Sequence, residues 1–346
     1  MSHRLPPFAI IVVCLGLSMA PAHAEETFEQ KVDDVLASKP SERFITITEE
    51  NDLFGSGTDQ HYTNGIRATL FNTKTEAPAV AKALDRFVPG FELNQDTAVY
   101  YSIGQNMYAP KDLTRVTPNP TDRPYAAFLY GSAGFANITD DHIDNLEVSL
   151  GVVGPAALGE QVQKAVHKAI DDREPKGWDS QLKNEPGVVV SWERRWPEAG
   201  KLEMGPLLLR ASPYGGATLG NVYTYASTGI TFQLVPSQYK WQSQPLRIKP
   251  SIPGSGYFSV PDGKFAWSLF GGLEGRAMGR NIFLDGNTFT DSPSVDKKYF
   301  VGDANAGLAL TWGRRQLSYT VNWRSLEFQG QEDADVFGAL SFGYRF

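Results

Sequence analysis

Apolar and polar residues alternate with a period of two along most of the chain. Within 315–326, for example, leucine, tyrosine, valine and tryptophan alternate with serine, threonine, asparagine and arginine. The segments 145–154 and 265–278 repeat this pattern. Such alternation is typical of β-strands with one apolar and one polar face. It predicts an all-β chain built from amphipathic strands.

The alternation predicts about twelve strands. Their approximate spans are 43–51, 62–72, 97–106, 125–137, 145–154, 186–196, 201–213, 215–233, 265–278, 298–312, 315–326 and 335–346. A soluble β-sandwich would bury the apolar faces between two sheets, whereas a membrane barrel turns them to lipid and keeps polar side chains inside. Aromatic residues make up 12% of the chain, which suits the interfacial girdles of such a barrel. We therefore predict a transmembrane antiparallel β-barrel.

An even number of strands places both ends of a bacterial barrel on the periplasmic side. The connections 52–62, 107–124 and 155–185 then lie on the external side. The short links 196–201 and 313–315 fall on the periplasmic side, where barrels have their short turns. The longest loops are therefore expected to face outward.

Three segments interrupt the alternation. The connection 73–96 is long for a periplasmic link and contains a helix-like stretch, Ala79 to Phe87. The segment 233–264 is rich in proline, glycine and serine and is interpreted as a long connection, although it could hide a further hairpin. Residues 156–171 have apolar residues at helical spacing, which predicts a short helix in an external loop. A helix in an otherwise all-β chain marks a place to look for function.

The N-terminal residues predict a cleavable secretory signal. A basic start precedes an apolar run at 8–19, and Ala22-His23-Ala24 supplies a small-x-small cleavage pattern. Residues 1–24 are then the signal peptide, and 25–346 form one barrel domain. The alternative is a retained anchor, for which the apolar run is short.

The last strand ends in an aromatic residue. Phe342, Tyr344 and the terminal Phe346 alternate with polar or small residues. A final amphipathic strand that ends in phenylalanine resembles the assembly signal of outer-membrane barrels. The outer membrane and its barrel assembly machinery, acting through Phe346, are therefore expected partners. The alternative is a soluble β-sandwich whose last strand happens to end in phenylalanine.

Charge and cysteine content exclude several classes of protein. The net charge of −7 argues against a nucleic-acid partner, because nucleic-acid-binding domains are usually basic. The one cysteine, Cys14, lies in the predicted signal, so the mature chain is not a disulfide scaffold. No later stretch is long and apolar enough to predict a membrane helix.

Two groups of residues have side chains suited to chemistry. Glu49-Glu50-Asn51-Asp52 ends the first predicted strand with three carboxylates and an amide oxygen, the ligands that calcium prefers. The alternative is an acidic strand end with loop-favouring residues. His167 follows Gln163 by one helical turn, so the two side chains share a face. Histidine is the commonest general base, although a lone surface histidine is usually only solvated. No nucleophile elbow, zinc motif or phosphate loop is present in the sequence.

Several short motifs in the first half of the mature chain form an ordered set. They are Glu50-Asn51-Asp52, Tyr62-Thr63-Asn64-Gly65, Asp122-Arg123-Pro124-Tyr125, Gly151 to Pro155, Gly159-Glu160-Gln161-Val162-Gln163 with His167, and Gly177-Trp178. Together they resemble the outer-membrane lipid A 3′-O-deacylases. The second half matches that family only as generic barrel strands.

The resemblance implies a twelve-stranded barrel enzyme. Its activity would be calcium-dependent removal of the 3′-linked acyloxyacyl group from lipid A, by a phospholipase-A2-like mechanism. Asn51 and Asp52 match metal-site and active-site positions, and Thr63 matches an active-site polar residue. Gln163 and His167 match the helix pair, with His167 as general base on water.

Two positions depart from the family pattern. A family lysine in the second external loop falls nearest Arg115, and a family glutamate six residues beyond the histidine aligns with Arg173. The alternatives are that a nearby carboxylate, Asp171, Asp172 or Glu174, substitutes for that glutamate, or that the metal shell differs. Arg115 or Arg123 could bind the phosphates of lipid A. For Arg123, an internal rim salt bridge is the alternative.

Two other functions stay open. An outer-membrane phospholipase would use the same calcium and histidine chemistry on glycerophospholipids. A passive porin or structural barrel would need no external helix, so the segment 156–171 argues against it.

Overall fold

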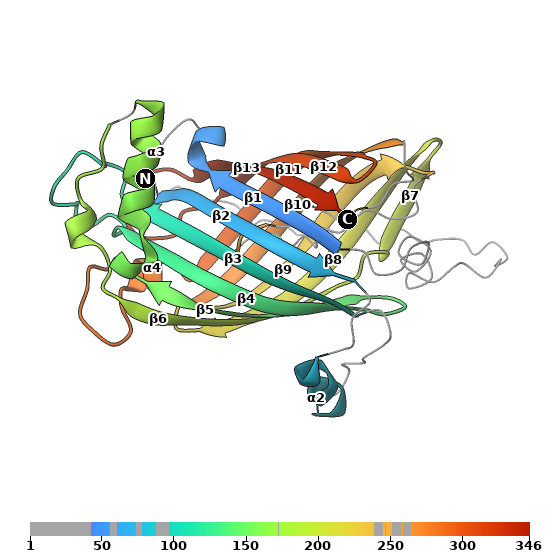
Figure 1. Cartoon of the computed structure of the whole chain (residues 1–346), viewed down its shortest axis with the longest axis horizontal. Helices are drawn as coiled ribbons and strands as arrows, with labels where there is room; N and C mark the ends of the chain where they lie inside the picture. The colour runs from blue at the N-terminus through green and yellow to red at the C-terminus, as the bar shows by residue number, and fades with distance from the viewer. Residues whose placement is uncertain are drawn as a thin grey trace, which may run out of the picture.

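The fold is a closed antiparallel barrel (Figure 1). The computed structural model describes residues 43–55, 61–73, 78–87, 97–171, 173–238, 245, 247–250, 258 and 264–346. The strands are β1 (Arg43–Asn51), β2 (His61–Asn72), β3 (Thr97–Ala109), β4 (Ala126–Ile138), β5 (Ile143–Val153), β6 (Glu185–Arg195), β7 (Gly200–Met204), β8 (Leu207–Gly220), β9 (Tyr223–Pro236), β10 (Phe265–Asn281), β11 (Phe300–Trp312), β12 (Arg315–Arg324) and β13 (Asp335–Arg345).

The barrel closes where its first and last strands meet. β1 pairs with both β2 and β13, and β6 pairs with β5 and β8, which completes a ring of twelve. At the closure, the backbone N–H of Phe346 donates to the carbonyl of Arg43 at 2.9 Å. The predicted twelve-stranded barrel is confirmed.

The strand predicted at 201–213 has different bounds in the structure. β7 pairs with β8 over Leu207–Ala211, and β6 pairs with β8 over Tyr214–Gly220. β7 therefore continues the sixth wall strand, and the periplasmic turn lies at Gly205-Pro206 rather than at 196–201. Gly205 has a φ of +61°, a conformation that glycine adopts without strain. Residues 213–215, where a break between two strands is predicted, are instead paired continuously within β8.

Side chains alternate between the lipid-facing wall and the lumen, as the sequence pattern predicts. Along β1, Ile45 and Ile47 are exposed on the wall, whereas Thr46, Thr48 and Glu50 are buried inside. The interior holds buried ion pairs, four between strand residues and the last between loop residues: Arg67–Glu147, Arg276–Glu274, Arg276–Asp303, Arg324–Asp303 and Arg123–Glu327. This arrangement suits a barrel with apolar surroundings and a polar interior.

Part of the connection between β9 and β10 lies inside the lumen. Arg247 is bonded to Glu50, and the carbonyl of Pro250 accepts from Arg324 at 2.6 Å. Phe258 packs edge-on against Phe44, with ring centroids 5.3 Å apart. The segment 233–264, predicted only as a connection, thus contributes residues that fill the barrel.

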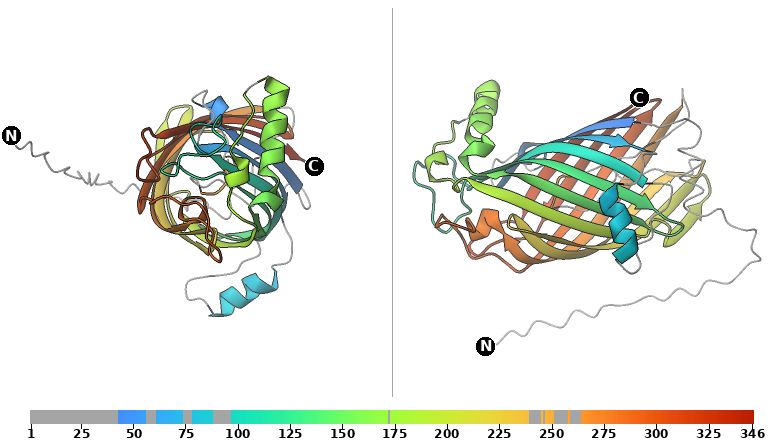
Figure 2. Two further views of the ribbon diagram at one scale, coloured as in Figure 1. Left: turned by 90° about the vertical axis from the view of Figure 1, so that its left-hand side faces the viewer. Right: turned by 60° about the horizontal axis from the view of Figure 1, so that its bottom comes forward.

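The short helix α4 (Ile282–Asp285) is buried, and its Phe283 stacks on Tyr108, whereas two longer helices lie outside the barrel. We call the end that carries α3 (Gly159–Ile170) the external end, and the end with β7 and Phe346 the periplasmic end, as the strand count predicts (Figure 1). α2 (Ala79–Phe87) lies against the outer wall nearer the periplasmic end, where Ala81 packs on Phe135 (Figure 2). Both helices occupy positions that the sequence predicts. No helix in the described part of the chain is long and apolar enough to span a membrane.

Candidate functional site

The helix α3 is seated on the lipid-facing side of the wall, at the external rim. On β3, Tyr101 and Ile103 are exposed on that side, so Gln105 and Met107 face the same way. Gln105 donates its side-chain N–H to the carbonyl of Ala157, at 2.5 Å, in the short helix η2 (Pro155–Ala157) that precedes α3. The helix therefore covers the end of the outer wall rather than the mouth of the lumen.

Gly159 allows α3 to approach the wall. A Cβ atom at this position would lie 2.5 Å from the Cβ of Ala127 and 2.6 Å from the ring of Trp178. No larger residue fits without a shift of these neighbours. The N-terminal end of α3 is thus fixed against β4.

The two predicted helix residues are brought together and buried. Gln163 is 2% exposed and His167 is 4% exposed. The Nδ1 atom of His167 lies 2.6 Å from the backbone carbonyl oxygen of Arg173. Because a carbonyl can only accept, Nδ1 carries the proton, and Nε2 of the neutral ring is the basic nitrogen. This hydrogen bond gives His167 the tautomer that a general base needs.

Gln163 is oriented by Trp178. The indole Nε1–H of Trp178 donates to the Gln163 side-chain oxygen at 2.7 Å. The amide nitrogen of Gln163 then has no hydrogen-bond partner among the described residues, although it is buried. A buried donor without a partner is rare in folded proteins and indicates a position that a ligand or water can occupy.

The second half of the site is the external end of β1 and β2. Asn51 is paired with Asn64, and its side-chain oxygen accepts from the backbone N–H of Leu53 at 2.8 Å. This bond starts the short helix η1 (Asp52–Phe54). Asp52, the first residue of η1, is 3% exposed. The local fold therefore holds a carboxylate at the rim, beside the amide of Asn51.

Thr63 lies in an irregularity of β2. The pairing of β2 with β3 shifts register between Tyr62 and Asn64, so Thr63 is the extra residue of a bulge. Bulges occur often beside active sites, because they redirect one side chain. Thr63 is 4% exposed, and its hydroxyl has no hydrogen-bond partner among the described residues.

The helix and the strand rim lie on the same side of the external end. One end of α3 is held at β4, and the other rises toward η1, the blue turn at the end of β1, in Figure 1 and in the left view of Figure 2. Since Gly159 is the end at β4, the end with His167 is the one that approaches η1. The arrangement places a base, an amide donor, a hydroxyl and a carboxylate along one rim.

The external loop 110–125 adds positive charge beside α3. Arg115 is exposed, and its backbone carbonyl lies close to Gly177. Hydrogen bonds from Thr114 hold the pKa of Asp112 below its usual value, with smaller contributions from Arg115 and Arg173. Arg115 and Arg173 therefore both lie near the ionised carboxylate of Asp112. Their cationic side chains are exposed at the outer surface.

Arg123 lies away from the external surface. It is fully buried, forms an ion pair with Glu327 at 3.2 Å and lies over the ring of Tyr108 at 4.9 Å. The internal salt bridge is therefore the correct alternative, and Arg123 is not placed to bind a phosphate.

The oxygen ligands for a calcium ion are few. Glu50 points into the lumen and is bonded to Arg247, and Glu49 is exposed on the outer wall. Among the described residues there is no group of three or more acidic, histidine or cysteine side chains suited to a metal. The hard oxygen donors at the rim are the side chains of Asp52, Asn51 and Thr63. Their chemistry fits calcium, which would complete its shell with backbone carbonyls, waters or substrate oxygens.

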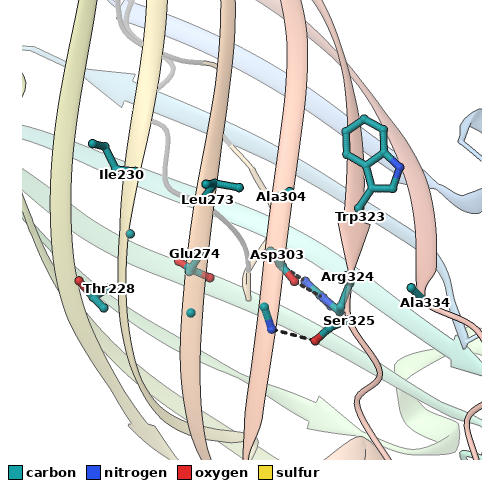
Figure 3. A pocket seen from close by; sticks show the side chains of 13 residues that line it. Thr228, Ile230, Leu273, Glu274, Asp303, Ala304, Trp323, Arg324, Ser325 and Ala334 are labelled. Carbon is teal, nitrogen blue, oxygen red and sulfur yellow. Dashed lines mark hydrogen bonds and ion pairs between the residues drawn. The ribbon is translucent and has the colours of Figure 1, made fainter. Parts of the chain in front are cut away.

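A separate hollow of about 620 Å³ lies on the wall formed by β9 to β12. Ile230, Leu273 and Trp323 face it from the lipid side, while Glu274, Asp303 and Arg324 point toward the lumen behind it (Figure 3). None of the predicted site residues lines it. It is a depression in the apolar wall, distinct from the site under α3.

Comparisons with known proteins identify the family. A family model described as outer membrane protein LpxR matches residues 10–346. The chain belongs to the LpxR family. It is accordingly an outer-membrane protein, and its apolar wall faces the lipid of that membrane. A search of curated proteins gives no match.

A solved structure supports the same fold. LpxR from Salmonella typhimurium is 19% identical, with a TM-score of 0.70, and the match covers 87% of this chain and 99% of that chain. The translocator domain of the autotransporter NalP from Neisseria meningitidis is 12% identical over 92% of this chain and 93% of that chain, with a TM-score of 0.38. The family assignment and the first likeness agree on a twelve-stranded LpxR barrel.

Sequence reasoning missed the residues that seat and orient the helix. Gln105 is a polar side chain on the apolar face of β3, between Ile103 and Met107, and this break in the alternation was the available signal. In the sequence, Trp178 stands out only as part of the Gly177-Trp178 motif, and its hydrogen bond to Gln163 has no sequence signal.

Proposed function

We propose that this protein is a lipid A 3′-O-deacylase, a calcium-dependent ester hydrolase of the outer membrane. The observation that carries the proposal is the position of His167. It is a buried histidine, with its basic nitrogen defined, on a helix that covers the lipid-facing side of the external rim. Lipid A fills the outer leaflet, so an ester-bearing substrate would meet this rim from the membrane.

The residues support hydrolysis by water. Nε2 of His167 would remove a proton from a water molecule as that water's oxygen attacks the ester carbonyl carbon. The bond from that carbon to the sugar oxygen would then break, and the sugar oxygen would receive the proton from His167. The Gln163 amide would donate a hydrogen bond that positions the water or the carbonyl. No covalent enzyme intermediate is needed.

Calcium would be held by Asp52 and Asn51. When bound, the ion would polarise the carbonyl and stabilise the negative charge on its oxygen. The Thr63 hydroxyl, buried at the same rim, would hydrogen-bond to the substrate or to the metal shell. Arg115, exposed on the neighbouring loop, would pair with a lipid A phosphate.

Mass spectrometry of membrane lipids tests the substrate. Expression of the protein should lower the mass of lipid A by that of the 3′-acyloxyacyl group, and it should leave glycerophospholipids intact. Loss of acyl chains from glycerophospholipids with unchanged lipid A would favour the phospholipase alternative. The porin alternative is disfavoured by the residues that fill the lumen, Arg247 to Pro250 and Phe258. Recognition of Phe346 by the barrel assembly machinery stays a prediction.

The seating of α3 predicts the effect of a valine at position 159. Gly159→Val should push α3 off the wall and lower deacylation by about tenfold or more, since displacements near 1 Å can cost up to about a hundredfold. Gly275→Ala is the matched control, because a Cβ there meets no atom within 4 Å. Initial rates of purified variants, compared at equal folded fraction, measure the effect. Equal rates for Gly159→Val and wild type would show that the seating of α3 does not matter.

A further inference from the structure

The lumen segment Arg247–Pro250 is fixed at the external half of the barrel. Asn106 donates to the carbonyl of Lys249 at 3.3 Å, and Arg324 donates to that of Pro250 at 2.6 Å. Ile248 is 1% exposed and lies where Gly65 leaves room for it. A segment that leaves the wall at β9 therefore reaches the inner face of β1 and β2.

Glu50 is the group to which this segment binds. The Nε of Arg247 donates to one Glu50 carboxylate oxygen at 2.7 Å, and the backbone N–H of Ile248 donates to the same oxygen at 3.1 Å. The hydroxyl of Tyr62 donates to the other oxygen at 3.0 Å. Glu50 is 1% exposed and Arg247 is 5% exposed. Removing either partner would leave an uncompensated charge in the lumen.

The two strand residues in this contact, Glu50 and Tyr62, are direct neighbours of the candidate site. Asn51 and Asp52 follow Glu50 directly, and Thr63 follows Tyr62. Side chains of successive strand residues point to opposite faces, so a bond that holds Glu50 inside also fixes the backbone that presents Asn51 outside and leads into η1 at Asp52. The bond to Tyr62 likewise fixes the residue at which the bulge with Thr63 begins. The contacts in the lumen therefore determine how Asp52 and Thr63 are held.

We propose that Arg247 is a positioning residue for the external site. By binding Glu50 through the lumen, it fixes the end of β1 and the bulge of β2 in the geometry that catalysis requires. The inference rests on the proposed function for its kinetic consequence, whereas its structural consequence can be measured without a substrate.

Four variants test the proposal, each in the full-length folded barrel. Arg247→Gln and Glu50→Gln break the contact. Arg247→Lys keeps the positive charge but loses the planar guanidinium group, which donates several hydrogen bonds in a fixed geometry. Glu274→Gln is the matched control, because Glu274 is also buried and also accepts from an arginine, Arg276 at 2.8 Å, and a tyrosine, Tyr214 at 2.9 Å. It lies on β10, four strands away from β1 in the wall.

Kinetics on lipid A give the first readout. Arg247→Gln and Glu50→Gln should lower kcat by about 10- to 100-fold with little change in KM, because a displaced reacting geometry affects the transition state more than binding. Arg247→Lys should lose less, and Glu274→Gln should change kcat less than about twofold, as a group remote from the reaction. A general loss of stability would instead affect Glu274→Gln equally, and that result would overturn the proposal.

Hydrogen exchange gives a readout that does not depend on activity. Peptides that cover 44–54 and 61–68 should exchange about tenfold faster in Arg247→Gln than in wild type, because the rim opens locally. The same peptides should be unchanged in Glu274→Gln. Unchanged exchange at the rim of Arg247→Gln would overturn the positioning role even if the enzyme is a deacylase. If wild type fails to deacylate lipid A, the proposed function fails, while the exchange data still decide whether Arg247 orders the rim.

Discussion

Replacement of His167 by alanine is expected to lower the rate of lipid A deacylation by about 10²- to 10⁴-fold, the usual contribution of a general base. The reason is the hydrogen bond between Nδ1 and the Arg173 carbonyl, which leaves Nε2 as the basic nitrogen of a buried ring. Release of the 3′-acyloxyacyl chain from purified lipid A, followed by mass spectrometry, measures the loss.

His142→Ala is the matched control for that experiment. His142 lies in the periplasmic turn between β4 and β5, where it is bonded to Asp141 at 2.5 Å and lies 3.3 Å from Asp144. Its removal should leave the rate within about twofold of wild type, since it is remote from the external rim. Full activity in His167→Ala would remove histidine from the mechanism, and equal losses in the two variants would indicate a folding defect.

The barrel was largely predictable because one physical rule acts on every strand. A wall between lipid and a polar lumen requires alternation, so β1, β4 and β12 begin and end within a residue or two of their predicted bounds. The rule fails where turn signals mislead. Pro213 to Gly216 resembles a turn in sequence, yet these residues are paired within β8. The true turn at Gly205-Pro206 is only two residues long.

The candidate site was predictable in part for a different reason. Local motifs identify five residues that the structure places along one external rim: Asn51, Asp52, Thr63, Gln163 and His167. The long-range contacts that hold these residues in place were not predictable. Arg247 acts on Glu50 from 197 residues away in the chain, and no local pattern encodes such a pairing.

The glutamate that the resemblance implies after the histidine has a different counterpart here. Arg173 occupies that position, and its contribution to His167 is a backbone carbonyl rather than a carboxylate. A backbone group can make this hydrogen bond whichever side chain follows it. The orientation of His167 therefore needs no acidic residue at position 173, but that position also supplies no carboxylate to a metal.

This shortage of carboxylates makes calcium dependence the sharpest test of the proposed chemistry. Chelation of calcium is expected to lower deacylation by about 10²- to 10³-fold, the loss seen when stabilisation of an oxyanion is removed. Readdition of calcium should restore the rate. Asp52→Asn should shift the calcium requirement upward, because it removes the buried Asp52 carboxylate beside Asn51 while it keeps the size of the side chain.

Asp291→Asn is the control for charge. Asp291 is exposed in the external loop between β10 and β11, so this variant removes the same charge from the same end of the barrel. Calcium titrations followed by calorimetry should show weaker binding for Asp52→Asn and unchanged binding for Asp291→Asn. If chelation leaves the wild-type rate intact and no binding is detected, calcium has no role. Gln163, Thr63 and Arg115 would then have to stabilise the oxyanion, and substitution of the Gln163 amide would become the most damaging change after that of His167.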